Sequence, residues 1–103
     1  MVYKIHATDN AQRDLDHIIE YIALELENPS AAATLLDKVD ECYDDLSAMP
    51  YMYSECQSPR LKAMGYRKAI LGNYIMVYRV EEELQTVYIL RYFHGKQDYE
   101  KLL

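Results

Sequence analysis

Six cations and two further titratable side chains in the carboxy-terminal half could do chemistry on an anion. Clustered arginines hold phosphate or carboxylate groups through paired hydrogen bonds. Histidine titrates near neutral pH, so His94, with Tyr99 beyond it, is a candidate for proton transfer. These types favour an anion-binding basic face, whose predicted members are Arg60, Lys62, Arg67, Arg79, Arg91 and Lys96.

The charge is distributed unevenly between the two halves of the chain. The formal net charge is −6, which is unusual for a protein that would hold RNA by general attraction. Residues 1–55 contain twelve acidic and three basic side chains, whereas residues 56–103 contain five acidic and eight basic ones. A phosphate-facing surface is therefore expected only in the carboxy-terminal half.

Three strand patterns must position these side chains. Residues 65–71 and 74–80 are rich in aromatic and β-branched types, and Gly72-Asn73 between them is typical of a tight hairpin turn. Glu81-Glu82-Glu83 forms a second turn before the pattern of residues 85–93. The sequence predicts a three-stranded antiparallel meander with a short tail at 94–103.

The amino-terminal half has one short strand pattern and two helical ones. Residues 2–6 alternate in polarity, which indicates a half-buried strand. Apolar side chains then recur three or four apart over residues 11–26 and again over residues 32–49. Asn28-Pro29 separates the two helices and predicts a tight antiparallel hairpin. Residues 50–63 are expected to form an ordered irregular crossover.

These elements predict one α+β domain over residues 1–103, in the order β-α-α-β-β-β. The helical hairpin is expected to cover one face of an antiparallel sheet. The other face is expected to stay free and to carry the basic set, because side chains alternate between the faces of a sheet.

The remaining composition excludes several classes of protein. Cys42 and Cys56 are too few for a metal site and are expected to stay reduced, Cys42 buried on a helix and Cys56 incidental in a loop. No cofactor or metal is expected. No apolar run is long enough to span a membrane, and the start lacks the pattern of a secretory signal, so a cytoplasmic protein is expected.

Several of these side chains also have ordinary structural explanations. Arg67, Arg79 and Arg91 could simply pair with carboxylates of this acidic chain. The strand tyrosines could serve as packing residues, because aromatic side chains favour strands.

An ordered set of motifs resembles the RelE/ParE superfamily of type II toxin-antitoxin toxins. The set comprises Gly65-Tyr66-Arg67, an aromatic residue before Val77-Tyr78-Arg79-Val80, and Ile89-Leu90-Arg91 followed by His94 and Asp98-Tyr99. The Asp14-Leu15 and Tyr21-Ile22 pairs of the first helix look closer to the ParE branch.

The resemblance implies a growth-inhibiting toxin, of the kind linked to plasmid stabilisation, that a cognate antitoxin wraps and neutralises. A ParE-like toxin would act on DNA gyrase through protein contacts. A RelE-like alternative would cut ribosome-bound mRNA as an endoribonuclease, with Arg67, His94 and Tyr99 as catalytic residues. A third alternative is a non-toxic member that keeps only partner binding.

Two positions depart from the ribonuclease pattern. Ile75 and Ala69 occupy places where ribonuclease members commonly have cations. Loss of two groups that stabilise charge in the transition state could cost several kcal/mol. The departures favour the gyrase or the non-toxic hypothesis over the ribonuclease.

Overall fold

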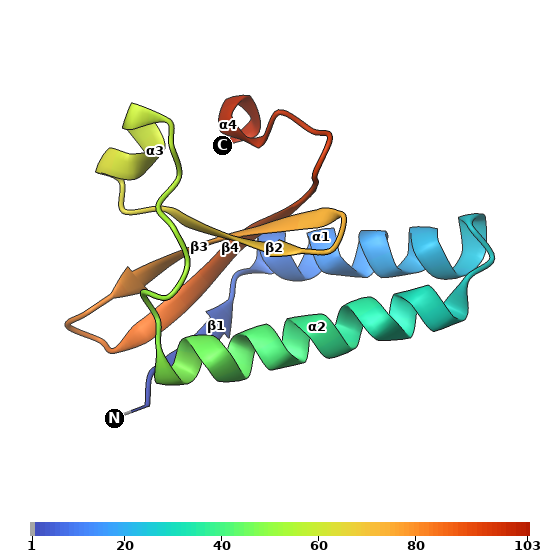
Figure 1. The fold of residues 1–103 in the computed structure, drawn as a ribbon, viewed down its shortest axis with the longest axis horizontal. Helices are drawn as coiled ribbons and strands as arrows, with labels where there is room; N and C mark the ends of the chain where they lie inside the picture. Colours follow the sequence, from blue (N-terminus) through green and yellow to red (C-terminus); the bar gives the residue numbers. More distant parts are fainter. Residues whose placement is uncertain (1) are drawn as a thin grey trace.

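A computed structural model describes residues 2–103 and has an α+β fold in which a four-stranded sheet lies between helices (Figure 1). One strand and several helices precede the predicted meander. The elements in order are β1 (Lys4–Ala7), α1 (Asp9–Glu20), η1 (Tyr21–Glu25), α2 (Pro29–Ala48), α3 (Pro59–Ala63), β2 (Arg67–Leu71), β3 (Tyr74–Glu81), β4 (Thr86–His94) and α4 (Tyr99–Leu102).

The sheet has the strand order β1-β4-β3-β2 and is mixed. β2, β3 and β4 form the predicted antiparallel meander. The prediction of a purely antiparallel sheet was wrong, because β1 pairs in parallel with β4, with Lys4 opposite Thr86 and Ala7 opposite Ile89. A parallel pair needs a long crossover, which the two helices and the first two meander strands supply here.

Side-chain caps define the beginnings of the two long helices. The Thr8 hydroxyl accepts a hydrogen bond from the Ala11 amide at 3.2 Å and starts α1. The Asn28 side chain accepts from the Ala31 amide at 3.1 Å, and Pro29 follows at the first position of α2. Between them α1 widens into the single π-helical turn η1. Figure 1 draws α1 and α2 next to each other beside the sheet.

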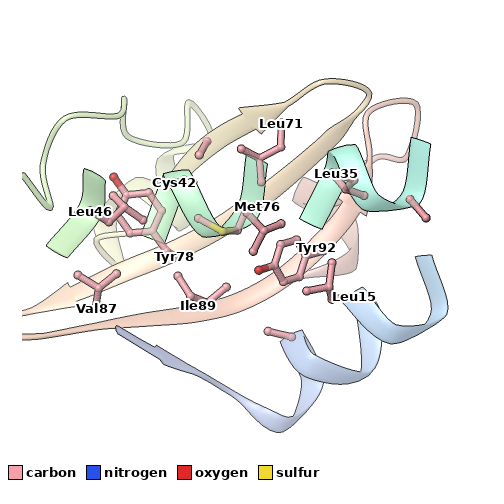
Figure 2. Packing of buried hydrophobic residues seen from close by; sticks show 14 of the residues in the cluster. Leu15, Leu35, Cys42, Leu46, Leu71, Met76, Tyr78, Val87, Ile89 and Tyr92 are labelled. Atoms are coloured by element: carbon pink, nitrogen blue, oxygen red, sulfur yellow. The ribbon is translucent and has the colours of Figure 1, made fainter. Parts of the chain in front are cut away.

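The larger hydrophobic core lies between these helices and one face of the sheet (Figure 2). The helical stripe predicted from sequence supplies Leu15, Leu35 and Leu46, all buried. The sheet supplies the fully buried Met76 and Ile89. The alternation predicted for the first strand also holds, because Tyr3, Ile5 and Ala7 pack against this core.

A second, smaller core covers the opposite face of the sheet, which the sequence had predicted to be free. Figure 1 shows α3 and α4 on the side of the sheet away from α1 and α2. Beneath them five buried residues pack together, namely Cys56, Leu61, Val77, Phe93 and Tyr99. The expectation of an incidental Cys56 was wrong, since its side chain is fully buried. Helices of four and five residues are too short to leave a periodic signal in the sequence.

β4 contains a bulge that redirects its side chains. Tyr78 lies opposite Ile89, but Val77 lies opposite Arg91, so Leu90 is an extra residue in the ladder. Ile89 and Tyr92 therefore both face the larger core although they are three positions apart. No helix within residues 2–103 is both long and apolar enough to cross a membrane.

Candidate functional site

A groove of about 800 Å³ lies between the end of the first helix and the ends of β3 and β4. One side is formed by α1 and the residues after it, and the other by the strand ends and the tail. Its lining is mixed apolar, aromatic and polar, and includes Asp14, His17, Ile18, Tyr21, Leu26, Tyr74, Arg91, Phe93, His94 and Leu102.

An ion pair forms one wall of the groove. The Arg91 Nε donates to Asp14 Oδ2 at 2.6 Å, and a terminal nitrogen of Arg91 donates to Oδ1 at 3.2 Å. Asp14 Oδ2 also accepts the Tyr92 amide at 3.0 Å. β1 stops at Ala7, so Asp14 occupies the strand edge that β1 leaves uncovered. Arg91 is therefore committed to a carboxylate and is not a free phosphate ligand.

His94 lies at the rim of the groove in a defined orientation. Its Nδ1 accepts the Lys96 amide at 3.1 Å, so in the neutral ring the proton sits on Nε2. Its amide donates to the Gln97 side chain at 2.7 Å. The ring meets Tyr74 edge to face, with centroids 5.3 Å apart. His94 can thus offer an Nε2 hydrogen-bond donor to a bound group.

Arg67 contacts the loop that precedes β2. A terminal nitrogen donates to the Tyr53 carbonyl at 2.7 Å, and the guanidinium lies 5.0 Å from the centroid of the Tyr51 ring. Arg67 pairs with Tyr78 on β3, whereas His94 pairs with Tyr74. Four residues along a strand span about 13 Å. Arg67 and His94 therefore lie at opposite ends of the β2–β3 hairpin.

Tyr99 belongs to the second core. Its ring packs 6.2 Å from that of Phe93, and the Lys68 ammonium lies 5.4 Å from its centroid. Its hydroxyl is buried and has no hydrogen-bond partner among the described residues. The His94 ring, by contrast, packs on Tyr74 of the larger core. The three residues predicted to be catalytic therefore do not converge on one point.

The other predicted members of the basic face are dispersed as well. Arg60 donates to the Glu100 carbonyl at 2.7 Å and ties α3 to α4. Arg79 pairs with Glu81 at 3.1 Å and stacks over the Tyr88 ring at 4.6 Å. Lys62 and Lys96 are exposed on separate segments. Among residues 2–103, no group of three or more His, Cys, Asp and Glu side chains could hold a metal ion.

The family follows from a match over most of the chain. Residues 5–99 match the family described as the ParE toxin of the type II toxin-antitoxin system parDE. This chain belongs to the ParE toxin family. No curated protein matches it.

Solved toxins share the fold of this ParE-family chain. RelBE2 from Mycobacterium tuberculosis, a toxin-antitoxin complex, is 27% identical, with a TM-score of 0.65 over 91% of this chain and 92% of that one. The chromosomal ParDE system of P. aeruginosa is 21% identical, with a TM-score of 0.68 over 92% and 98% of the two chains. An E. coli RelE mutant in the free state is 13% identical, with a TM-score of 0.69 over 99% and 93%. The latter two show the fold alone.

The two positions without cations have packing explanations in this ParE-family member. Ala69 is fully buried in the larger core, where a charged side chain would need a partner. Ile75 packs against the second core. Ala69 is thus part of the protein's interior, and Ile75 is a partly buried packing residue.

A carboxylate bound by two tyrosine hydroxyls, which the sequence did not predict, joins three segments of this toxin. The hydroxyls of Tyr3 and Tyr51 both donate to the Glu82 carboxylate, Tyr3 at 2.8 Å. These hydrogen bonds, that from Tyr51 first, lower the pKa of Glu82. The bond to Glu82 in turn raises the pKa of Tyr51 to about 12. The three residues are far apart in sequence, and no local motif marks them.

A second missed contact lies in the larger core. The hydroxyls of Tyr43 and Tyr92 are 2.6 Å apart and share a hydrogen bond. Burial raises the pKa of both phenols, so both stay protonated at neutral pH. The pair therefore forms a buried polar contact between α2 and β4.

Proposed function

We propose that this ParE-family toxin inhibits growth by binding DNA gyrase through protein contacts and does not cut RNA. The dispersal of Arg67, His94 and Tyr99 carries this proposal. A ribonuclease must hold its charge-stabilising and proton-transferring groups around one scissile phosphate. Here Arg67 is committed to loop carbonyls, and the Tyr99 hydroxyl is enclosed in a core. A protein-contact mechanism needs neither group to approach the other.

The proposal includes a cognate antitoxin as partner. The RelBE2 and ParDE structures are a toxin-antitoxin complex and a toxin-antitoxin system. By analogy with these two systems, this chain would be neutralised by a protein encoded beside it. An antitoxin that folds on binding could cover a large part of so small a toxin.

A ribosome-dependent mRNA endoribonuclease is the second candidate. The 27% identity to the M. tuberculosis RelBE2 structure favours keeping it. His94 would then supply Nε2 at the groove, and the exposed Lys62 and Lys96 would contact the RNA. A non-toxic member that retains only antitoxin binding is the remaining alternative.

Pulse labelling after induced expression in a bacterial host separates the three. DNA synthesis and protein synthesis are followed separately over the first minutes. The gyrase proposal expects DNA synthesis to stop first, with a DNA-damage response. If protein synthesis stops first and messages are cut, the ribonuclease replaces it, and Arg67→Ala, His94→Ala and Tyr99→Phe become the variants to test. If neither process changes, the chain is a non-toxic binder.

A further inference from the structure

An exposed apolar patch lies at the end of the molecule where the amino terminus, the end of α2 and the β3–β4 turn meet (Figure 1). This end is opposite to the connection between α1 and α2. Five side chains of the patch are between 44% and 73% exposed, namely Val2, Met49, Tyr51, Met52 and Leu84. They come from three segments far apart in the sequence, so the fold brings them together. Apolar surface gathered in this way marks interaction sites. We call these five residues the terminal patch.

Hydrogen bonds hold the three segments of the terminal patch in place. The Tyr3 amide donates to the Ser47 carbonyl at 2.9 Å, and the Ser47 hydroxyl donates back to the Tyr3 carbonyl at 2.7 Å. The hydroxyls of Tyr3 and Tyr51 both donate to the Glu82 carboxylate in the β3–β4 turn. The backbone under the patch is therefore ordered before a partner binds, which lowers the entropic cost of association.

The residue types of the terminal patch are those that protein interfaces favour. Tyrosine, methionine and arginine are enriched in the centres of interfaces. Here Met49 and Met52 lie beside Tyr51, and the Arg67 guanidinium lies over the Tyr51 ring. Flexible methionine side chains adapt to the shape of a partner. The composition thus favours a protein as the occupant of this surface.

Carboxylates border the terminal patch. Glu82 and Glu83 lie in the β3–β4 turn, and the carbonyl of Asp45 on α2 accepts the Met49 amide at 2.8 Å. None of these three carboxylates forms an ion pair with another residue in 2–103. Lys4 of β1 is exposed at the same end, but the carboxylates outnumber it. The patch therefore offers apolar contact within an acidic border.

This combination favours one class of occupant. A second copy of the chain, docked patch to patch, would bring the carboxylates of both copies together, which is unfavourable. RNA would bring its phosphates to the same carboxylates. A basic protein surface has the complementary charge. A surface that holds DNA is basic, because it neutralises phosphates with Lys and Arg.

We propose that the terminal patch docks on the basic surface by which DNA gyrase holds DNA. This inference rests on the proposed gyrase function and names the face of the toxin that makes the contact. The net charge of −6, which is unfavourable for holding RNA, would then steer the toxin towards its target. Because the toxin and DNA would use overlapping surfaces of gyrase, DNA should compete with the toxin.

Truncation of the terminal patch tests its apolar half. The probe is intact DNA gyrase, purified from the host used for pulse labelling and titrated calorimetrically with the full toxin chain. Met49→Ser/Leu84→Ser should weaken binding about tenfold or more, with little salt dependence. The matched control, Leu36→Ser/Met64→Ser, removes two exposed apolar side chains outside the patch and should change affinity less than about threefold. Circular dichroism checks that each variant keeps its fold.

Charge reversal at the border tests the electrostatic half. Asp45→Lys/Glu83→Lys should weaken binding to gyrase about tenfold, and the loss should shrink as salt is raised. Glu20→Lys/Glu25→Lys changes the net charge equally, but at the end of α1 and in η1, at the opposite end of the molecule. This control should change affinity less than about threefold. Equal weakening by either control would overturn the inference.

A DNA duplex tests which surface of gyrase is contacted. Saturating gyrase with a duplex that it binds should weaken the affinity for the wild-type toxin about tenfold. Unchanged affinity would place the toxin away from the DNA-holding surface and overturn the inference, as would wild-type affinity in either patch variant. In each of these cases gyrase binding itself, and with it the proposed function, would stand. If the wild-type chain does not bind gyrase at all, the proposed function and the inference both fail.

Discussion

The two faces of the sheet are both buried, but they are covered in different ways. One face lies under α1 and α2, long helices with apolar stripes and side-chain caps. The other lies under α3 and α4, helices of five and four residues without side-chain caps, and it encloses an unpartnered hydroxyl. The first cover defines the fold, whereas the second only closes off a face that would otherwise be open. The two faces are therefore both buried, but by helices of very different length.

Leucine truncation should expose this difference most strongly. Leu46 and Leu61 are both fully buried, the first on α2 and the second on α3. Leu46→Ala should lower the free energy of unfolding by about 4 kcal/mol, whereas Leu61→Ala should lower it by about 2 kcal/mol because a short helix can relax into the cavity. Urea unfolding of both variants gives the numbers. Equal losses would mean that the two covers are equally rigid.

The second-largest effect on stability is expected at the Arg91–Asp14 ion pair, at the edge of the sheet. Asp14→Asn weakens the bonds to Arg91 and to the Tyr92 amide, both partly buried. We expect a loss of about 2 kcal/mol, because a half-shielded charge-assisted contact contributes more than a surface pair. Asp40→Asn, on the exposed side of α2, is the control and should leave the urea midpoint unchanged. A neutral result for Asp14→Asn would show that β4 holds its edge without the carboxylate.

Removing one phenolic oxygen from each core should give effects of opposite sign. Tyr92→Phe breaks the hydrogen bond with Tyr43 in the larger core and should cost about 1 kcal/mol. Tyr99→Phe removes the unpartnered hydroxyl of the second core and should stabilise the protein by about 1 kcal/mol. Thermal unfolding of the two variants compares them directly. Destabilisation by Tyr99→Phe would mean that its hydroxyl is satisfied in solution.

The smallest expected effect is a pH dependence of stability that arises from Glu82. The hydrogen bonds from Tyr51 and Tyr3 lower the pKa of Glu82 in the folded protein. Its contribution is therefore fully present above the unfolded-state pKa and is lost as pH falls through the lower folded value. Glu82→Gln should flatten the fall in urea midpoint between about pH 5 and about pH 3. Identical pH profiles for the variant and the wild type would contradict this linkage.

The sequence predicted what local chemistry determines. Gly72-Asn73 located the β2–β3 turn, Asn28-Pro29 located the start of α2, and the apolar spacing identified the larger core. It could not predict that β1 joins β4, because a parallel partner has no local turn to mark it. It also missed α3 and α4, whose few residues carry no periodicity.

The candidate site was less predictable because it depends on register and on loop paths. Arg67 was expected on an open face, but the loop at Tyr51 and Tyr53 supplies carbonyls that take its guanidinium. The position of His94 follows from the β3–β4 register, and the bulge at Leu90 could not be read from residue types. Residue type identified the cations correctly but could not show which of them already have partners.

The pairing of the first strand with the last also bears on how the protein is made. Thr8 and Leu90, 82 positions apart, are joined by a hydrogen bond from the Thr8 hydroxyl to the Leu90 carbonyl. Contacts of such long separation slow folding, because a large loop must close before they form. During synthesis, β1 has no strand to pair with until β4 has left the ribosome. The nascent chain thus reaches its complete sheet only near the end of translation, when β4 becomes available to pair with β1.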